Sequence, residues 1–222
     1  FDLDRIDLLN FLFEHGLKIE KINSDLRLNA CHTVALNNLA HFIPVMLQQG
    51  FSVDHFMEQK GRGMTAVNIA AKKGCIEVIE KLLEASLPEE AFLESDIHSD
   101  SAFAHLMITN NLHAIEVLLK HGFSLDKLLT HQVGHSECQT LQYLALRGKL
   151  EIFQFFCSQI PRDQVSHYLS QKTPEGETLV HFAVKNIDKN TKKILELLSQ
   201  YLTTDELIAC NDEGRNLFHL LA

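Results

Sequence analysis

Three stretches of this chain follow one pattern of residue types, and this recurrence constrains the fold more than any other feature. They are residues 63–71 (GMTAVNIAA), 176–184 (GETLVHFAV) and 214–222 (GRNLFHLLA). Recurrence at a fixed period is typical of solenoids, in which short units stack on one another. Because solenoids usually provide extended binding surfaces, the pattern favours binding over catalysis.

The Thr of this pattern serves as a marker that can be followed along the chain. The markers, spaced 36 to 39 residues apart, are Asn29, Thr65, Ser101, Gln139, Thr178 and Asn216. After a marker come two apolar pairs four residues apart, such as Val78-Ile79 and Leu82-Leu83. Pairs with this spacing lie on one face of an α-helix. Each unit is therefore predicted to contain a short first helix, a turn and an amphipathic second helix.

The ends of the predicted helices are marked by glycine, asparagine and proline. The turns between first and second helices are expected near Asn38, Gly74, Asn110 and Gly148. Gly50 and Gly122 are predicted to cap second helices at their C-terminal ends. Pro44 falls within a second helix, where an interior proline costs about 3 kcal/mol or more. Either that helix starts late, with Pro44 in its first turn, or it is kinked.

The pattern resembles the ankyrin repeat, G-x-T-P-L-H-x-A-A-x-x-G-H followed by a second helix ending in L-L-x-x-G, with a period of about 33 residues. The match to this pattern is good at residues 64–74, 117–122 and 177–184. When the weaker units are placed by the spacing of the markers, the resemblance covers essentially the whole chain. It implies an all-α ankyrin-repeat helical solenoid with short β-hairpin-like loops. The Pro of the family is replaced by Ala30, Ala66, Ala102, Thr140, Leu179 and Leu217. The His of the family, whose ring bonds the neighbouring Thr and turn backbone, is kept only as His32, His181 and His219.

The repeat phase predicts a single array over residues 1–222. It has a half-repeat at 1–24, full repeats at about 25–60, 61–96, 97–134, 135–173 and 174–210, and a half-repeat at 211–222. We expect the extra length per unit in longer loops at the hairpin tips, and two or three further residues near 187–190. The last half-repeat is apolar, whereas the outer face of a terminal repeat should be polar. We therefore expect a piece of a longer protein, or partner domains that cover the ends.

Composition excludes several classes of protein. The net charge of −9, from 20 Lys and Arg against 29 Asp and Glu, argues against a nucleic-acid-binding protein. No apolar run approaches the roughly 18 residues that span a bilayer, so membrane insertion is not expected. Five cysteines without paired spacing indicate reduced thiols and a cytoplasmic location, which would be the host cytoplasm for a secreted bacterial effector.

Candidate chemical sites are weak. His131, His135 and Cys138 have metal-ligand types at plausible spacing, but a zinc site normally needs a fourth ligand. Cys138 with His135 or His105 would need a residue to orient the base, and none is identifiable. Motifs for phosphate loops, dinucleotides and zinc peptidases are absent from the sequence. We predict no enzyme activity, no catalytic residue, no cofactor and no metal.

The resemblance implies that a partner protein binds on the concave face, formed by the hairpin tips and the outer side of the first helices. The residues at these positions are Leu36, Arg62, Met64, Lys72, Lys73, Asp100, Ile108, Thr109, His135, Leu146, Arg147, Glu177 and Lys185.

The helix positions of this set are basic and apolar, whereas the second helices are rich in Glu. Lys72, Lys73, Arg147 and Lys185 alternate with apolar residues, with no Asp or Glu among them. One hypothesis is a groove for an acidic segment with apolar anchors, in which charge sets on-rate and specificity. The alternative is that these cations solvate helix C-termini, where the helix dipole favours them.

Together these features predict a protein–protein interaction module. Its diverged repeats are similar to those of ankyrin-containing effectors of intracellular bacteria. As an alternative, the array is a regulatory or substrate-docking segment of a larger multidomain enzyme.

Overall fold

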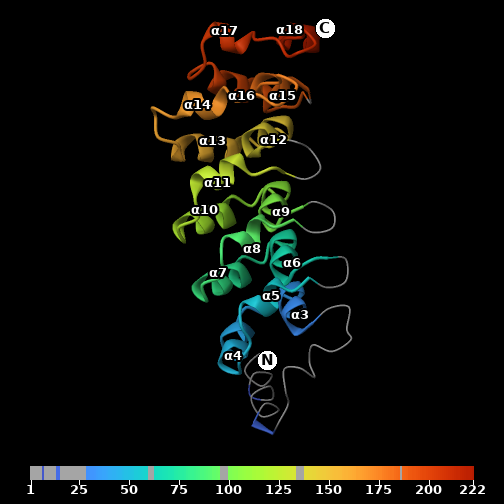
Figure 1. Ribbon diagram of the computed structural model, residues 1–222, viewed down its shortest axis with the longest axis vertical. Helices are drawn as coiled ribbons and strands as arrows, with labels where there is room; N and C mark the ends of the chain where they lie inside the picture. Colours follow the sequence, from blue (N-terminus) through green and yellow to red (C-terminus); the bar gives the residue numbers. More distant parts are fainter. Residues whose placement is uncertain are drawn as a thin grey trace. The chain divides into compact units, whose positions relative to one another are not determined.

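A computed structural model describes residues 29–59, 63–95, 100–133, 138–185 and 187–222, and in addition Asp7, Glu14 and His15. The predicted half-repeat at 1–24 thus lies almost wholly outside the described residues. The chain divides into two compact units, residues 1–121 (unit 1) and 122–222 (unit 2), each of which consists of short helices and loops (Figure 1). The single array over 1–222 stays a prediction.

Unit 1 contains three helix pairs. Its first helices are α3 (Ala30–Leu36), α6 (Ala66–Lys73) and α9 (Ala102–Ile108), and its second helices are α4 (Phe42–Gln48), α7 (Ile76–Glu84) and α10 (Leu112–Lys120). The first helix α6 packs between α3 and α9, and the second helix α7 packs between α4 and α10. First helices thus form one row and second helices another, as the repeat pattern predicts.

Unit 2 has the same arrangement. Its first helices are α12 (Thr140–Leu146), α15 (Leu179–Lys185) and α18 (Leu217–Leu221), and its second helices are α13 (Leu150–Gln159) and α16 (Thr191–Leu198). The first helix α15 packs between α12 and α18, while α13 packs on α12 and α16 on α15. The described part of the chain is therefore all-α apart from isolated β-bridges.

The marker residues fix where the first helices begin. Asn29, Thr65, Ser101, Gln139 and Asn216 are N-caps, and Thr178 directly precedes α15. The Ser101 hydroxyl, for example, accepts the Ala104 N–H at 3.0 Å. Such caps satisfy backbone donors that have no partner within the helix, so the repeated Thr, Ser, Asn or Gln is explained by local chemistry.

The turns between first and second helices are left-handed where the sequence predicts them. Asn38, Gly74, Asn110 and Gly148 have φ values of 53°, 71°, 57° and 60°. Asparagine and glycine are the residues that adopt this conformation at least cost. Gly50 and Gly122 are also left-handed after second helices. Helix α4 starts at Phe42 with Pro44 in its first turn, which confirms the late start.

Short helices lie between the second helices and the next hairpins, while three of the hairpin tips, where the sequence predicts the extra length, lie partly outside the described residues. A short helix follows each second helix: α5 (Asp54–Met57), α8 (Glu90–Leu93), α11 (Leu125–Thr130), α14 (Val165–Leu169) and α17 (Thr204–Leu207). The first four of these helices bury an apolar anchor, namely Phe56, Phe92, Leu128 and Leu169. Burying a large apolar side chain stabilises by roughly 1.5–3 kcal/mol, which favours a helical turn here over an extended loop.

The loops that enter the first helices are hairpin-like. Antiparallel bridges join Ser95 to Ser101 and Gln132 to Gln139. In unit 2, the Thr173 N–H also donates to the Glu177 carbonyl at 2.9 Å. No helix in the described residues has the length and apolar character that crossing a bilayer requires.

Candidate binding surface

Three consecutive first helices of unit 1 present their last residues to solvent. Leu36 ends α3, Lys72 and Lys73 end α6, and Ile108 ends α9. Leu36 and Ile108 are each 41% exposed, although the residues before them in the same helices are largely buried. Because α6 packs between α3 and α9, these ends form a row in which a basic pair separates two apolar side chains. We call this row the unit 1 helix-end row.

The basic pair at the centre of the row owes its position to α6. Thr65 and Asn68 form a capping box at the start of this helix, and left-handed Gly74 ends it. Lys72 and Lys73 therefore lie in the last turn, where the helix dipole favours positive charge. Both side chains are exposed, and no ion pair with another described residue neutralises them. Their charges are thus available to a partner.

Thr109 follows Ile108 as the C-cap of α9 and is exposed. Its hydroxyl donates to the His105 carbonyl at 2.9 Å, which leaves a polar edge beside the apolar side chain. Of the predicted tip residues in unit 1, Met64 and Asp100 are half-buried. The Met64 carbonyl accepts a hydrogen bond from the His32 ring, so this tip is held by the preceding repeat. Arg62 lies outside the described residues.

Unit 2 presents a different surface at the corresponding positions. Leu146 is half-buried at the end of α12, and the exposed Arg147 guanidinium lies over the Tyr143 ring, 5.7 Å from its centroid. The Lys185 ammonium forms an ion pair with Glu177 at 2.5 Å and lies 5.0 Å from the centre of the Phe182 ring. Two predicted partner-binding residues, Glu177 and Lys185, are thus brought together and neutralise each other. His135 lies outside the described residues.

Two histidines at the histidine position of the repeat pattern, His32 and His181, have a structural role. The Thr178 N–H donates to Nδ1 of His181 at 3.1 Å, so Nε2 carries the proton and donates to the Arg215 carbonyl at 2.8 Å. Nδ1 of His32 lies 2.5 Å from the Asn29 side-chain oxygen, and its Nε2 lies 2.9 Å from the Met64 carbonyl oxygen. Each of these rings joins its own helix start to the next hairpin, as the resemblance implies.

The metal site considered from the sequence includes His135, which lies outside the described residues, so the absence of that site stays a prediction. The described residues contain no group of three His, Cys, Asp or Glu side chains arranged to hold a metal ion. Burial raises the pKa values of both Cys31 and Cys157 to about 12. Cys138 is buried as well, whereas Cys210 is exposed. Buried thiols with a raised pKa are poor nucleophiles because the thiolate is the reactive form.

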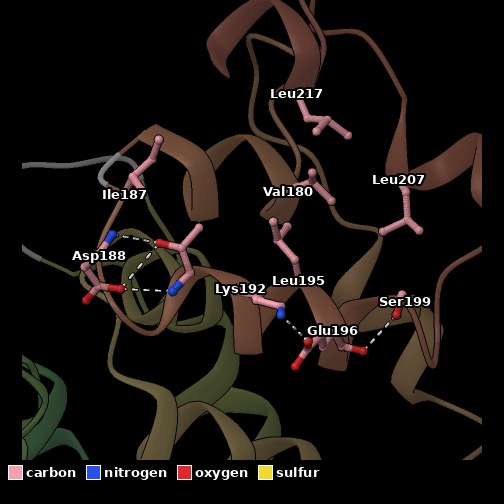
Figure 2. A pocket seen from close by; sticks show the side chains of 10 residues that line it. Val180, Ile187, Asp188, Lys192, Leu195, Glu196, Ser199, Leu207 and Leu217 are labelled. Carbon is pink, nitrogen blue, oxygen red and sulfur yellow. Dashed lines mark hydrogen bonds and ion pairs between the residues drawn. The ribbon is translucent and has the colours of Figure 1, made fainter. Parts of the chain in front are cut away.

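Sequence reasoning missed a second surface, a pocket of unit 2 to which Ile187, Leu195, Leu207 and Leu217 contribute (Figure 2). Its single sequence signal is the apolar last half-repeat that contains Leu217. Ile187 falls in the insertion between α15 and α16, for which the repeat pattern offers no equivalent position.

Comparisons of sequence find nothing: no protein-family model matches the chain, and no curated protein matches it. Comparison of structures, by contrast, finds similar proteins. The ankyrin repeat domain of Bcl-3, described as a unique member of the IkappaB protein family, superposes with a TM-score of 0.72 and 17% identity, over 97% of this chain and 86% of that one.

Two further solved structures are similar. The ankyrin repeat protein EF0377 gives a TM-score of 0.65 at 18% identity, over 86% of this chain and 89% of that one. An ankyrin repeat domain from Acinetobacter baumannii AYE gives 0.67 at 19% identity, over 86% and 88%. With capped first helices, left-handed turns and hairpin-like loops repeated along both units, the chain has the ankyrin-repeat solenoid fold, with strongly diverged repeats.

Proposed function

We propose that this protein binds another protein through the unit 1 helix-end row, and that the bound segment carries acidic residues between two apolar anchors. The observation behind the proposal is the alternation of exposed Leu36, the unneutralised pair Lys72 and Lys73, and exposed Ile108 on adjacent helices. Repeat arrays commonly bind proteins over such extended surfaces.

The division of roles follows from the chemistry of the row. Burial of apolar area contributes roughly 25 cal/mol per Å², so Leu36 and Ile108 would supply most of the affinity. Exposed charges contribute less to affinity, but they speed association and select a partner of opposite charge. Lys72 and Lys73 would therefore accelerate binding of an acidic segment and make it dependent on salt.

In unit 2, Arg147 is the predicted cation that remains exposed without an ion pair among the described residues. The Glu177–Lys185 pair presents no net charge and suits a neutral part of a partner. We therefore expect the acidic residues of the partner to be bound mainly by Lys72 and Lys73 of unit 1. The narrower ideas of a bacterial effector acting on a host protein, and of a docking segment in a larger enzyme, stay predictions.

The test compares the chain with its Lys72→Glu/Lys73→Glu variant as baits in cell lysate, followed by affinity measurements on each captured protein over a range of salt concentrations. A partner that uses the row should bind the variant at least about 10-fold more weakly and with a flatter salt dependence. The matched control is Lys81→Glu/Lys120→Glu, which makes the same charge change on α7 and α10. Equal binding and salt dependence for all three proteins would overturn the proposal.

A further inference from the structure

The residues of the unit 1 helix-end row are in register across three helices. Leu36, Lys72 and Ile108 occupy the same position relative to the N-cap of their own helix. Helix α6 packs between α3 and α9, so Lys72 lies between the two apolar side chains (Figure 1). The axes of packed helices are about 8–10 Å apart. The row from Leu36 to Ile108 therefore spans about 16–20 Å, which is two such separations.

A polar line runs beside this row, one position further along each helix. It consists of the exposed residues Asn37, Lys73 and Thr109. The Asn37 amide donates to the Thr33 carbonyl, and the Thr109 hydroxyl donates to the His105 carbonyl, each at 2.9 Å. These bonds fix both side chains and leave their oxygens as acceptors. The polar line thus offers a hydrogen-bond acceptor on either side of a cation.

An extended partner segment suits these acceptors better than a helical one does. In the interior of a helix, the backbone N–H groups are already bonded to carbonyls of the same helix. In an isolated extended segment they have no such partner and can donate to another molecule. A segment laid across the three helix ends could therefore donate its backbone N–H groups to Asn37 and Thr109 only if it is extended.

The geometry of an extended chain sets the spacing of its side chains on the row. An extended chain rises about 3.3 Å per residue, and alternate side chains lie on the same face. Six residues cover about 20 Å and return to that face, whereas after five the side chain points away. The side chains two and four residues after the first anchor also face the row. They lie on either side of its centre, within reach of the flexible side chains of Lys72 and Lys73.

We propose that the unit 1 helix-end row binds an extended segment with two apolar residues six positions apart and acidic residues two and four positions after the first. The apolar residues contact Leu36 and Ile108, and the acidic residues pair with Lys72 and Lys73. This inference rests on the function proposed above and specifies the conformation and the residue spacing of the bound segment.

The test uses four fluorescent synthetic peptides with blocked termini, whose anisotropy is measured during titration with the 222-residue chain. The matching peptide is L-S-E-S-E-S-L. Two peptides share its composition: L-E-S-S-S-E-L moves the acidic residues to the opposite face, and L-S-E-S-E-L-S moves the second anchor. The fourth, A-L-A-A-A-E-A-A-E-A-A-A-L-A, places leucines about 16 Å apart on one face of a helix, with both acidic residues between them. We expect saturable binding of the matching peptide and at least about 10-fold weaker binding of the other three.

Lys72→Glu/Lys73→Glu should weaken binding of the matching peptide at least about 10-fold. Lys81→Glu/Lys120→Glu is the matched control and should leave it unchanged, and far-ultraviolet circular dichroism verifies that both variants are folded. The inference would be overturned by absence of saturable binding, by equal binding of the four peptides, by tighter binding of the helical peptide, or by equal binding to both variants.

The proteins captured from lysate test the proposed function separately. A captured protein that depends on Lys72 and Lys73, while the matching peptide has no advantage, would refute the extended segment and leave the proposed function standing. Captured proteins that bind the Lys72→Glu/Lys73→Glu variant as well as the unchanged chain would refute the proposed function, and this inference with it.

Discussion

The Asp188 carboxylate lies directly against the Cα of Gly148. A Cβ at position 148 would come within 2.6 Å of the Asp188 Cγ, a distance that real side chains do not tolerate. The same carboxylate accepts the backbone N–H groups of Asn190 and Thr191 at 2.7 and 3.0 Å, and thus supports the start of α16. The turn of one repeat and the inserted residues of the next are therefore fitted to each other in unit 2.

Gly148→Ala should lower the free energy of unfolding by about 2–3 kcal/mol, because it combines a left-handed φ of 60° with this overlap. Gly122→Ala is the matched control, since Gly122 has a φ of 88° but nothing within 4 Å of a Cβ. It should cost only about 1 kcal/mol. Urea denaturation measures both, and equal losses would show that the Asp188 contact adds nothing.

Asn68→His should raise the free energy of unfolding by about 1 kcal/mol. The Nδ2 group of Asn68 is buried and has no hydrogen-bond partner among the described residues. At the same repeat position, His32 and His181 reach the next hairpin with Nε2. A histidine at 68 should reach the Asp100 carbonyl in this way, because its ring extends further than the asparagine amide. Denaturation by urea checks the gain; a loss of stability would mean that the buried site cannot accommodate a ring.

The short helices that follow the second helices should be essential to the core. Phe56→Ala, in α5, removes a fully buried ring and should cost about 3–5 kcal/mol. Phe218→Ala makes the same change in α18, where the side chain is 63% exposed, and should change stability by less than about 0.5 kcal/mol. Thermal or urea unfolding distinguishes the two, and a small effect of Phe56→Ala would contradict the role assigned to α5.

Stability should fall at high pH because of buried thiols. Burial, with a smaller effect from Glu58, raises the pKa of Cys31 from 9.0 in an exposed thiol to about 12 in the folded chain. Below about pH 9 the Cys31 thiol is protonated in both the folded and the unfolded chain, so it causes no loss of folding stability there. Between about pH 9 and pH 12 the thiol is ionised in the unfolded chain but still protonated in the folded chain. The free energy of unfolding therefore falls by up to about 1.4 kcal/mol per pH unit. Urea denaturation of the chain and of Cys31→Ala at pH 8 and pH 10.5 measures the difference; parallel losses would rule out this thiol as the cause.

Local chemistry was sufficient to predict the repeat from the sequence. A Thr, Ser, Asn or Gln that caps a helix and an Asn or Gly that adopts a left-handed turn act within a few residues of their own position. Thr65 and Gly74 could therefore be placed at the two ends of a first helix without any knowledge of the fold. The exposed row of Leu36, Lys72 and Ile108 follows from the same phase, since these residues occupy one position in three successive repeats.

Interactions between residues far apart in the sequence were decided only by the tertiary structure. The short helices α5 and α8 form because Phe56 and Phe92 find a core built by neighbouring repeats, which no local pattern contains. The Glu177–Lys185 ion pair and the contact of Asp188 with Gly148 likewise depend on how helices and loops are positioned in space. The sequence by itself determined the period, the caps and the turns. Packing decided which charges are neutralised and which apolar side chains are buried, because both depend on distances between side chains that separate elements bring together.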